Sequence, residues 1–189
     1  MRRLSTLHRG LSLRDTRGCA GGQAGFTLFE LIVVVCIVAI MAGILFNRLQ
    51  MYQEAAEKAA MQQTAAAIKS ALQMRVAAYL MNGRETDIEH LRSENPVSWL
   101  QERPQNYAGA FYGDAYARVA PGSWYFDLSQ RELVYVVNLG HYFKPGADGR
   151  KWVRYRVKIG YEEMPQKDAP PRKVLSAANF APVHPYVWF

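Results

Sequence analysis

The sequence has few of the residues from which catalytic and metal sites are built. Only two of its 189 residues are cysteine, Cys19 and Cys36, and its four histidines are scattered along the chain. It contains no His-Glu-x-x-His run, no cysteine and histidine spacing typical of zinc sites, and no phosphate-binding glycine loop. Two isolated carboxylates, Asp148 and Asp168, fall short of the roughly six to eight oxygen ligands that calcium takes. We therefore expect no enzyme activity, no metal and no cofactor.

Charge is almost absent from residues 26–46, where Glu30 is the one charged side chain. At a rise of about 1.5 Å per residue, a helix of about 21 residues measures about 30 Å, the thickness of the hydrocarbon core of a bilayer. Insertion of a carboxylate in such a helix costs about 2.5 to 3.5 kcal/mol at the bilayer centre and less near its edge. A residue that is kept at this cost is by default a candidate for a function. The sequence therefore predicts a transmembrane helix with Glu30 as its candidate functional residue.

The basic residues are concentrated ahead of this segment. Five arginines and one aspartate occur within residues 1–25, so that 18 basic and 15 acidic residues follow and the formal charge of +7 falls to +3. Because the basic side of a membrane helix usually stays in the cytoplasm, this distribution predicts a cytoplasmic N-terminus and a periplasmic or extracellular C-terminal part. The positive charge is thus an orientation signal, and nucleic acid is not an expected partner.

The run GFTLFEL at residues 25–31, directly ahead of an apolar helix, resembles the class III leader junction of type IV pilins and type II secretion pseudopilins. The resemblance implies that a prepilin peptidase cleaves after Gly25 and methylates Phe26, so that residues 1–25 form a basic leader. It also implies that Glu30, the fifth residue of the mature chain, supports assembly with other pilin or pseudopilin subunits. The further partners that it implies are an inner-membrane assembly platform with its ATPase, and membrane lipid.

Other interpretations of the N-terminus fit the residues less well. A secretory signal needs small residues at a cleavage site after the apolar segment, but residues 45–48 offer none. A lipoprotein signal built on Cys19 needs an apolar stretch upstream, where charged residues stand instead. A plain signal anchor remains the alternative. The chain departs from the pilin family at Asn47, where a helix-kinking proline is often found.

Residues 47–82 contain neither glycine nor proline and are rich in helix-forming residues. Gly83 is a suitable C-cap, so a single helix is predicted to continue from the membrane segment to this point. Glu54 and Lys58 have the spacing of an ion pair on its surface. We expect the helix to back a sheet, with a coiled coil as the alternative. Its apolar stripe comprises Leu49, Tyr52, Ala56, Ala60, Thr64, Ile68, Leu72, Val76 and Tyr79.

Residues 84–122 are predicted to form a connecting loop with short helices. One is indicated near residues 88–91, and Asn95 followed by Pro96 is typical of the start of another, which buries Trp99. We interpret the aromatic residues that follow as the packed interior of a long loop, with a binding surface as the alternative. They are Tyr107, Phe111, Tyr112 and Tyr116.

Residues 123–128 and 133–138 are two β-rich runs that predict a hairpin with a four-residue loop. Residues 152–161 alternate between apolar side chains on one face and basic ones on the other, which indicates a half-buried antiparallel strand. We interpret the basic face, Arg154, Arg156 and Lys158, as solvated surface, with binding of an acidic partner or DNA as the alternative. The aromatic end of the chain is expected to dock on the domain, with a weakly indicated fourth strand; it contains Phe180, Tyr186, Trp188 and Phe189.

Together these expectations describe an α+β protein similar to type IV pilins. They comprise a leader over residues 1–25, a transmembrane helix over 26–46, its amphipathic continuation over 47–83, and a globular domain over 84–189 with an antiparallel sheet of three to four strands. By resemblance the protein is a structural subunit of a pseudopilus for type II protein secretion or of a type IV pilus, located in the bacterial inner membrane and then in the filament. The alternative is a membrane-tethered minor pilin that acts as a binding module in adhesion or DNA uptake.

Overall fold

The long helix is the first element of the structure. The computed structural model describes residues 27–165 and 172–189, and it divides into one unit that ends at Gly43 and a second that begins at Ile44. Helix α1, Leu28–Met81, has 54 residues and belongs to both. The helix ends near Gly83, as predicted, and Gly83 has φ +68°. The two residues at this end bond back to the last turn, Gly83 N to Leu80 O at 3.2 Å and Arg84 N to Tyr79 O at 2.9 Å.

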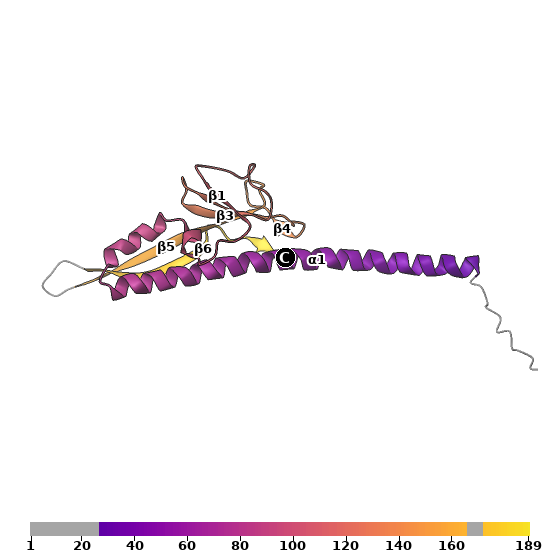
Figure 1. Cartoon of the computed structure of the whole chain (residues 1–189), viewed down its shortest axis with the longest axis horizontal. Helices are drawn as coiled ribbons and strands as arrows, with labels where there is room; N and C mark the ends of the chain where they lie inside the picture. Colours follow the sequence, from indigo (N-terminus) through magenta and orange to yellow (C-terminus); the bar gives the residue numbers. More distant parts are fainter. Residues whose placement is uncertain (1–26, 166–171) are drawn as a thin grey trace, which may run out of the picture. The chain divides into compact units, whose positions relative to one another are not determined.

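The second unit is a mixed sheet and two short helices beside the C-terminal part of α1 (Figure 1). Five strands are joined in the order β1-β2-β3-β5-β6, with β1 parallel to β2 and the other neighbours antiparallel. Strands β4 and β7 form a separate antiparallel pair. The bounds are η1 Glu85–Arg92, η2 Pro96–Trp99, β1 Tyr107–Phe111, β2 Trp124–Asp127, β3 Glu132–Val136, β4 Phe143–Lys144, β5 Trp152–Met164, β6 Arg172–Pro182 and β7 Val187–Trp188.

The α+β class is confirmed, but the prediction of three to four antiparallel strands is wrong. Strand β1 lies in the stretch that was predicted to be a loop. Its sequence, YAGAF, gives no strand signal because it has only small residues between two aromatic ones. The register against β2 shifts at Gly109, which has φ +124°. Strand β6 is much longer than the fourth strand that was weakly indicated at the end of the chain. The sequence did not reveal its length, because apolar and polar side chains do not alternate among its alanines, serine and asparagine. It nevertheless pairs with β5 from Pro182 to Arg172.

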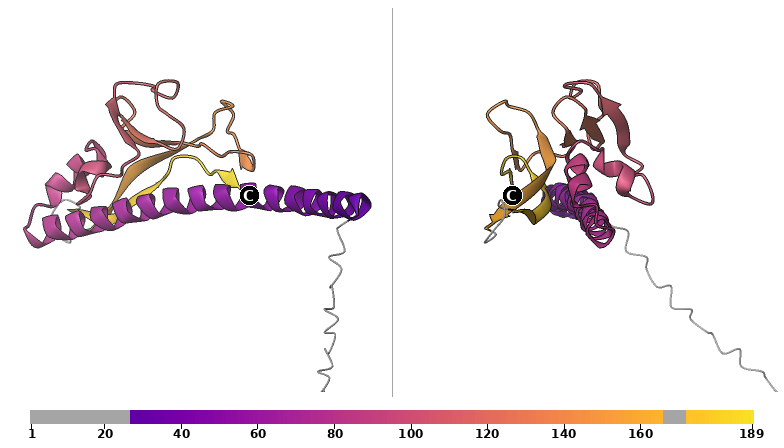
Figure 2. Two further views of the ribbon diagram at one scale, coloured as in Figure 1. Left: turned by 45° about the vertical axis from the view of Figure 1, so that its right-hand side comes forward. Right: turned by 90° about the vertical axis from the view of Figure 1, so that its left-hand side faces the viewer.

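The main core lies between the C-terminal part of α1 and one face of the sheet. Both views of Figure 2 show the sheet beside this part of the helix. The predicted stripe is confirmed for Ile68, Leu72 and Val76, which are buried together with Met61, whereas Leu49 and Tyr52 are exposed. The helix therefore backs a sheet as expected. Its buried partners on the strands include Trp124, Phe126, Leu133, Tyr135, Val153, Tyr155, Val157, Ile159 and Phe180.

A smaller core covers the opposite face of the sheet. Residues of the segment between β1 and β2 pack there against outward-facing side chains of β2 and β3, so the interpretation of this stretch as packed interior is confirmed for Phe111 and Tyr116. Tyr112 is the exception, with 83% of its surface exposed. The buried members are Ala115, Val119, Tyr125, Val134 and Val136.

Strand β5 follows its predicted alternation as far as Ile159, but not at Tyr161. The register against β6 shifts between Gly160 and Tyr161, and this bulge leaves the Tyr161 ring 38% exposed. The basic face also differs from a simple solvated surface, because Arg156 contacts the buried carboxylate of Glu132 at 2.5 Å and Arg154 contacts it at 3.7 Å.

Three buried tyrosines make the stability of the second unit sensitive to alkali. Burial, followed by the charges of Asp114 and Asp127, raises the pKa of Tyr125 to about 12, and burial raises the pKa of Tyr135 and of Tyr155 above their usual range. An unfolded chain ionises its tyrosines near pH 10. The unfolded state therefore loses protons first, and stability that is complete below about pH 10 falls as the pH rises further.

We expect the denaturation midpoint, followed by tryptophan fluorescence, to drop steeply above about pH 10. The part of the ultraviolet tyrosinate absorbance that comes from Tyr125, Tyr135 and Tyr155 should increase together with unfolding rather than before it. A protein that ionised all its tyrosines near pH 10 while it remained folded would contradict this prediction.

Candidate functional site

Glu30 occupies the first turn of α1 and is exposed. Its N–H donates to Thr27 Oγ1 at 3.2 Å, and Leu31 N donates to Thr27 O at 3.1 Å, so Thr27 caps the helix N-terminus. A Thr-x-x-Glu spacing at this position is that of a capping box, and a carboxylate there interacts favourably with the helix dipole. No partner of its carboxylate occurs among residues 27–165 and 172–189.

The first unit exposes apolar side chains around the whole circumference of its helix. In α1, which is near the N-terminus, an 18-residue window has a mean hydropathy of 3.0 and is 0% buried. The helix is long and apolar enough to span a membrane. Its exposed members before Gly43 include Leu28, Phe29, Leu31, Ile32, Val33, Val34, Val35, Ile37, Val38, Ile40 and Met41.

The predicted processing residues lie outside the residues that the structure describes. Gly25 and Phe26 immediately precede Thr27, the first described residue. Glu30 is therefore the predicted site residue whose surroundings are visible. It lies four positions beyond Phe26 in the sequence.

Glu54 forms an unexpected polar contact within the second unit. Its side chain is 2% exposed, and Oε1 accepts hydrogen bonds from Trp188 Nε1 at 2.8 Å and from Tyr142 N at 2.9 Å. The predicted ion pair with Lys58 is wrong, because Lys58 Nζ donates instead to Trp188 O at 2.7 Å. Both side chains thus hold the C-terminal strand β7 against α1.

Glu57, one turn further along, holds the segment between β3 and β4. Its Oε1 accepts from Tyr135 Oη at 3.0 Å and from Asn138 N at 2.7 Å, and Oε2 accepts from Leu139 N at 2.7 Å. We call Glu54, Glu57 and Lys58 the helix clamp. Sequence reasoning missed the clamp because acidic and basic residues four apart on a helix are typical of a solvated face, and its partners lie 78 to 134 positions away.

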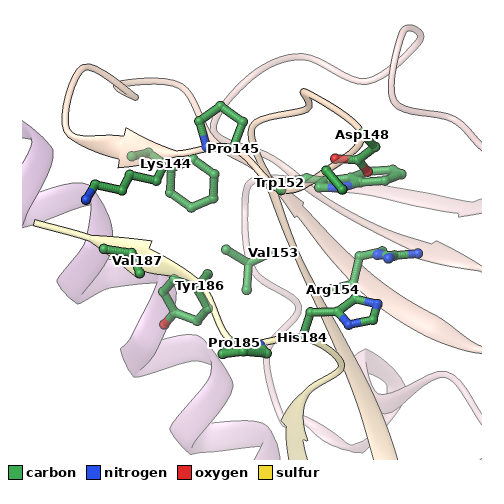
Figure 3. Close-up of a pocket in the computed structure, with 13 residues that line it drawn as sticks. Lys144, Pro145, Asp148, Trp152, Val153, Arg154, His184, Pro185, Tyr186 and Val187 are labelled. Carbon is green, nitrogen blue, oxygen red and sulfur yellow. The ribbon is translucent and has the colours of Figure 1, made fainter.

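A cleft of about 530 Å³ lies between the segment from Phe143 to Asp148 and the segment from His184 to Val187. Figure 3 shows Val153 of β5 at its centre, with Pro145 on one side and Pro185 and Tyr186 on the other. Its polar side chains include Lys144, Asp148, Arg154 and His184, and the Arg154 guanidinium lies 5.1 Å from the ring centroid of Trp152. An apolar floor with charged groups of both signs at its rim suits the binding of a ligand.

Metal-binding clusters are also absent from the described part of the chain, where no group of three or more histidine, cysteine, aspartate or glutamate side chains converges. A comparison with models of known protein families, with curated protein sequences and with solved structures found no match. The features of the chain that bear on its function are therefore the junction sequence, the apolar helix with its terminal carboxylate, and the α+β unit.

Proposed function

We propose that the protein is a pilin-like structural subunit of a filament. A prepilin peptidase removes residues 1–25, Phe26 becomes the methylated N-terminus, and the mature chain joins a pseudopilus for type II secretion or a type IV pilus. The observation that carries the proposal is that α1 begins at Leu28, directly after the junction, with one carboxylate in its first turn and an apolar segment that is exposed as far as Gly43. Such a surface needs lipid or other helices to cover it.

Glu30 favours the association of this helix with the same helix of other subunits. In a single subunit the carboxylate has no opposite charge in its apolar surroundings, whereas in an assembly it neutralises the amine of Phe26 on an adjacent subunit. A head-to-tail contact of this kind does not close on itself and generates an open helical filament. The apolar helices then form the interior of the filament and the α+β units its outside.

The proposal also defines topology and partners. Residues 1–25, with their five arginines, stay on the cytoplasmic side of the inner membrane, and the unit beyond α1 lies in the periplasm before assembly. The partners are the peptidase, other pilin or pseudopilin subunits, the inner-membrane platform and its ATPase, and lipid.

A membrane-tethered minor pilin that binds a target is the second candidate, and the cleft around Val153 favours it. DNA uptake is a weaker form of this candidate. Two of the three basic side chains on the β5 face, Arg154 and Arg156, already contact the buried carboxylate of Glu132, so the face offers less free charge than the sequence indicated. Phosphate contacts need such free cations.

Gly25→Val is expected to block maturation, because a β-branched side chain at the scissile bond should not fit the peptidase. The unprocessed product should be heavier than the wild-type protein by the mass of the 25-residue leader, as measured by intact mass spectrometry of membrane extracts. Gly22→Val, the same change three residues upstream, is the matched control and should still mature. A wild-type protein that keeps residues 1–25 in a strain with an active prepilin peptidase would overturn the proposed function.

A further inference from the structure

Strand β5 continues beyond the strand that covers one of its edges. Its pairing with β3 runs from Trp152 to Tyr155, while its pairing with β6 runs on to Met164. Within the described ranges, residues 157–164 of β5 therefore have a neighbouring strand on one edge only. An open edge presents backbone N–H and C=O groups that another extended chain can use.

A cleft of about 460 Å³ lies at this open edge, and we call it the β5 notch. The side chains of Val157 and Ile159 are buried in the main core, so these residues line the notch through their backbone. The other walls are the turn between β2 and β3 and the end of η1. The lining residues are Arg92, Ser129, Gln130, Arg131, Arg156, Val157, Lys158 and Ile159.

The lining carries four cationic side chains and no carboxylate. Two of these cations have carboxylate partners that do not line the notch: Arg156 contacts Glu132 at 2.5 Å, and Arg92 contacts Glu89 at 3.0 Å. Lys158 is exposed and forms no ion pair within the residues that the structure describes. The same holds for Arg131 within these residues. Two positive charges thus face the notch without compensation.

The guanidinium groups of Arg92 and Arg156 also have hydrogen-bonding capacity left over. The Nε atom of each is buried without an acceptor in the described part of the chain, although Arg92 Nη2 donates to Ile159 O. Buried donors without acceptors are uncommon in folded proteins.

We propose that the β5 notch binds an acidic peptide segment of a partner protein, in extended conformation along the open edge of β5. Carboxylates of the segment pair with Arg131 and Lys158, and its backbone lies beside Val157 of β5, short of Ile159, whose carbonyl already accepts from Arg92 Nη2. The lining contains no aromatic side chain on which a nucleobase would stack, which favours a peptide over single-stranded nucleic acid. The proposal uses only residues after Ile44 and does not depend on the membrane helix or on filament assembly.

The test measures fluorescence anisotropy of a labelled eight-residue peptide of alternating glutamate and threonine, with the full-length protein in detergent micelles. Wild-type protein should bind it in a salt-sensitive way. Arg131→Gln combined with Lys158→Gln should weaken binding about tenfold, the effect of losing two surface ion pairs. The matched control, Lys69→Gln combined with Arg103→Gln, removes the same charge from exposed positions outside both clefts and should change the dissociation constant less than about twofold.

Three outcomes would overturn the proposal. Equal loss in the two double variants would mean that only net charge matters. Tighter binding of an eight-nucleotide single-stranded DNA, lost with Arg131→Gln and Lys158→Gln, would assign the notch to nucleic acid. Complete displacement of the peptide by inorganic phosphate at millimolar concentration would show a site for small anions. Circular dichroism of each variant verifies that it is folded.

Discussion

Glu30→Ala is expected to leave the protein processed and inserted in the membrane but unable to form filaments. By the proposed function, the variant removes the charge that neutralises the N-terminal amine of an adjacent subunit. Breaking a buried ion pair by removing one partner costs about 3 to 5 kcal/mol, which corresponds to a loss of at least about a hundredfold in association. Filaments released by shearing, quantified against the subunit that stays in the membrane fraction, provide the measurement.

Two control variants separate charge from helix capping. Glu30→Gln keeps the size of the side chain without its charge and should fail to assemble in the same way. Thr27→Ala removes the Oγ1 atom that accepts the Glu30 N–H, a change worth about 1 kcal/mol of helix stability, and should lower filament yield much less. If Glu30→Gln assembled like the wild-type protein while Thr27→Ala did not, assembly would depend on the helix cap formed by Thr27, and the role assigned to the Glu30 charge would be wrong.

Glu54→Ala is expected to lower the free energy of unfolding by about 3 kcal/mol. Oε1 of Glu54 satisfies both Trp188 Nε1 and Tyr142 N in a site that is 2% exposed, and each buried donor without an acceptor costs about 1 to 3 kcal/mol. The removed side chain also leaves a cavity beside α1. Urea unfolding of the full-length protein in mild detergent, followed by tryptophan fluorescence, reports the loss and the release of Trp188.

Glu54→Gln is the matched control, because its amide oxygen can still accept from both donors. It should lose less than half as much stability as Glu54→Ala. Equal losses in the two variants would show that the negative charge, rather than the two hydrogen bonds, holds β7 to the helix. Wild-type stability in Glu54→Ala would show that the helix clamp contributes nothing.

The elements that could be predicted from the sequence are those whose signal is local. Residues a few positions apart determine the helix end at Gly83 and the hairpin of β2 and β3. They also determine the cap of η2, where Asn95 Oδ1 accepts from Val97 N at 3.1 Å. Strand β5 could be predicted because buried apolar side chains alternate with outward-facing ones from Val153 to Ile159. In each case the side-chain period or the turn residue determines the backbone directly.

The features that could not be predicted depend on distant partners. Strand β1 contains only alanine and glycine between its aromatics, and its extended conformation comes from pairing with β2. Glu54 and Glu57 have the sequence context of surface residues, and their burial follows from the return of the chain after β3 and at β7. The β5 notch likewise exists only because β3 ends where β5 does not. Local patterns carry no information on such long-range pairings.

The bond between Trp188 and Glu54 joins positions 134 residues apart. A chain that emerges from a ribosome or a translocon in order therefore presents Glu54 long before the indole that it needs. During that interval the carboxylate stays hydrated and α1 has no fixed place against β7. Contacts of such high sequence separation form late and slow folding. The final closure of the domain must accordingly follow its synthesis, and a chaperone has an interval in which to act on it.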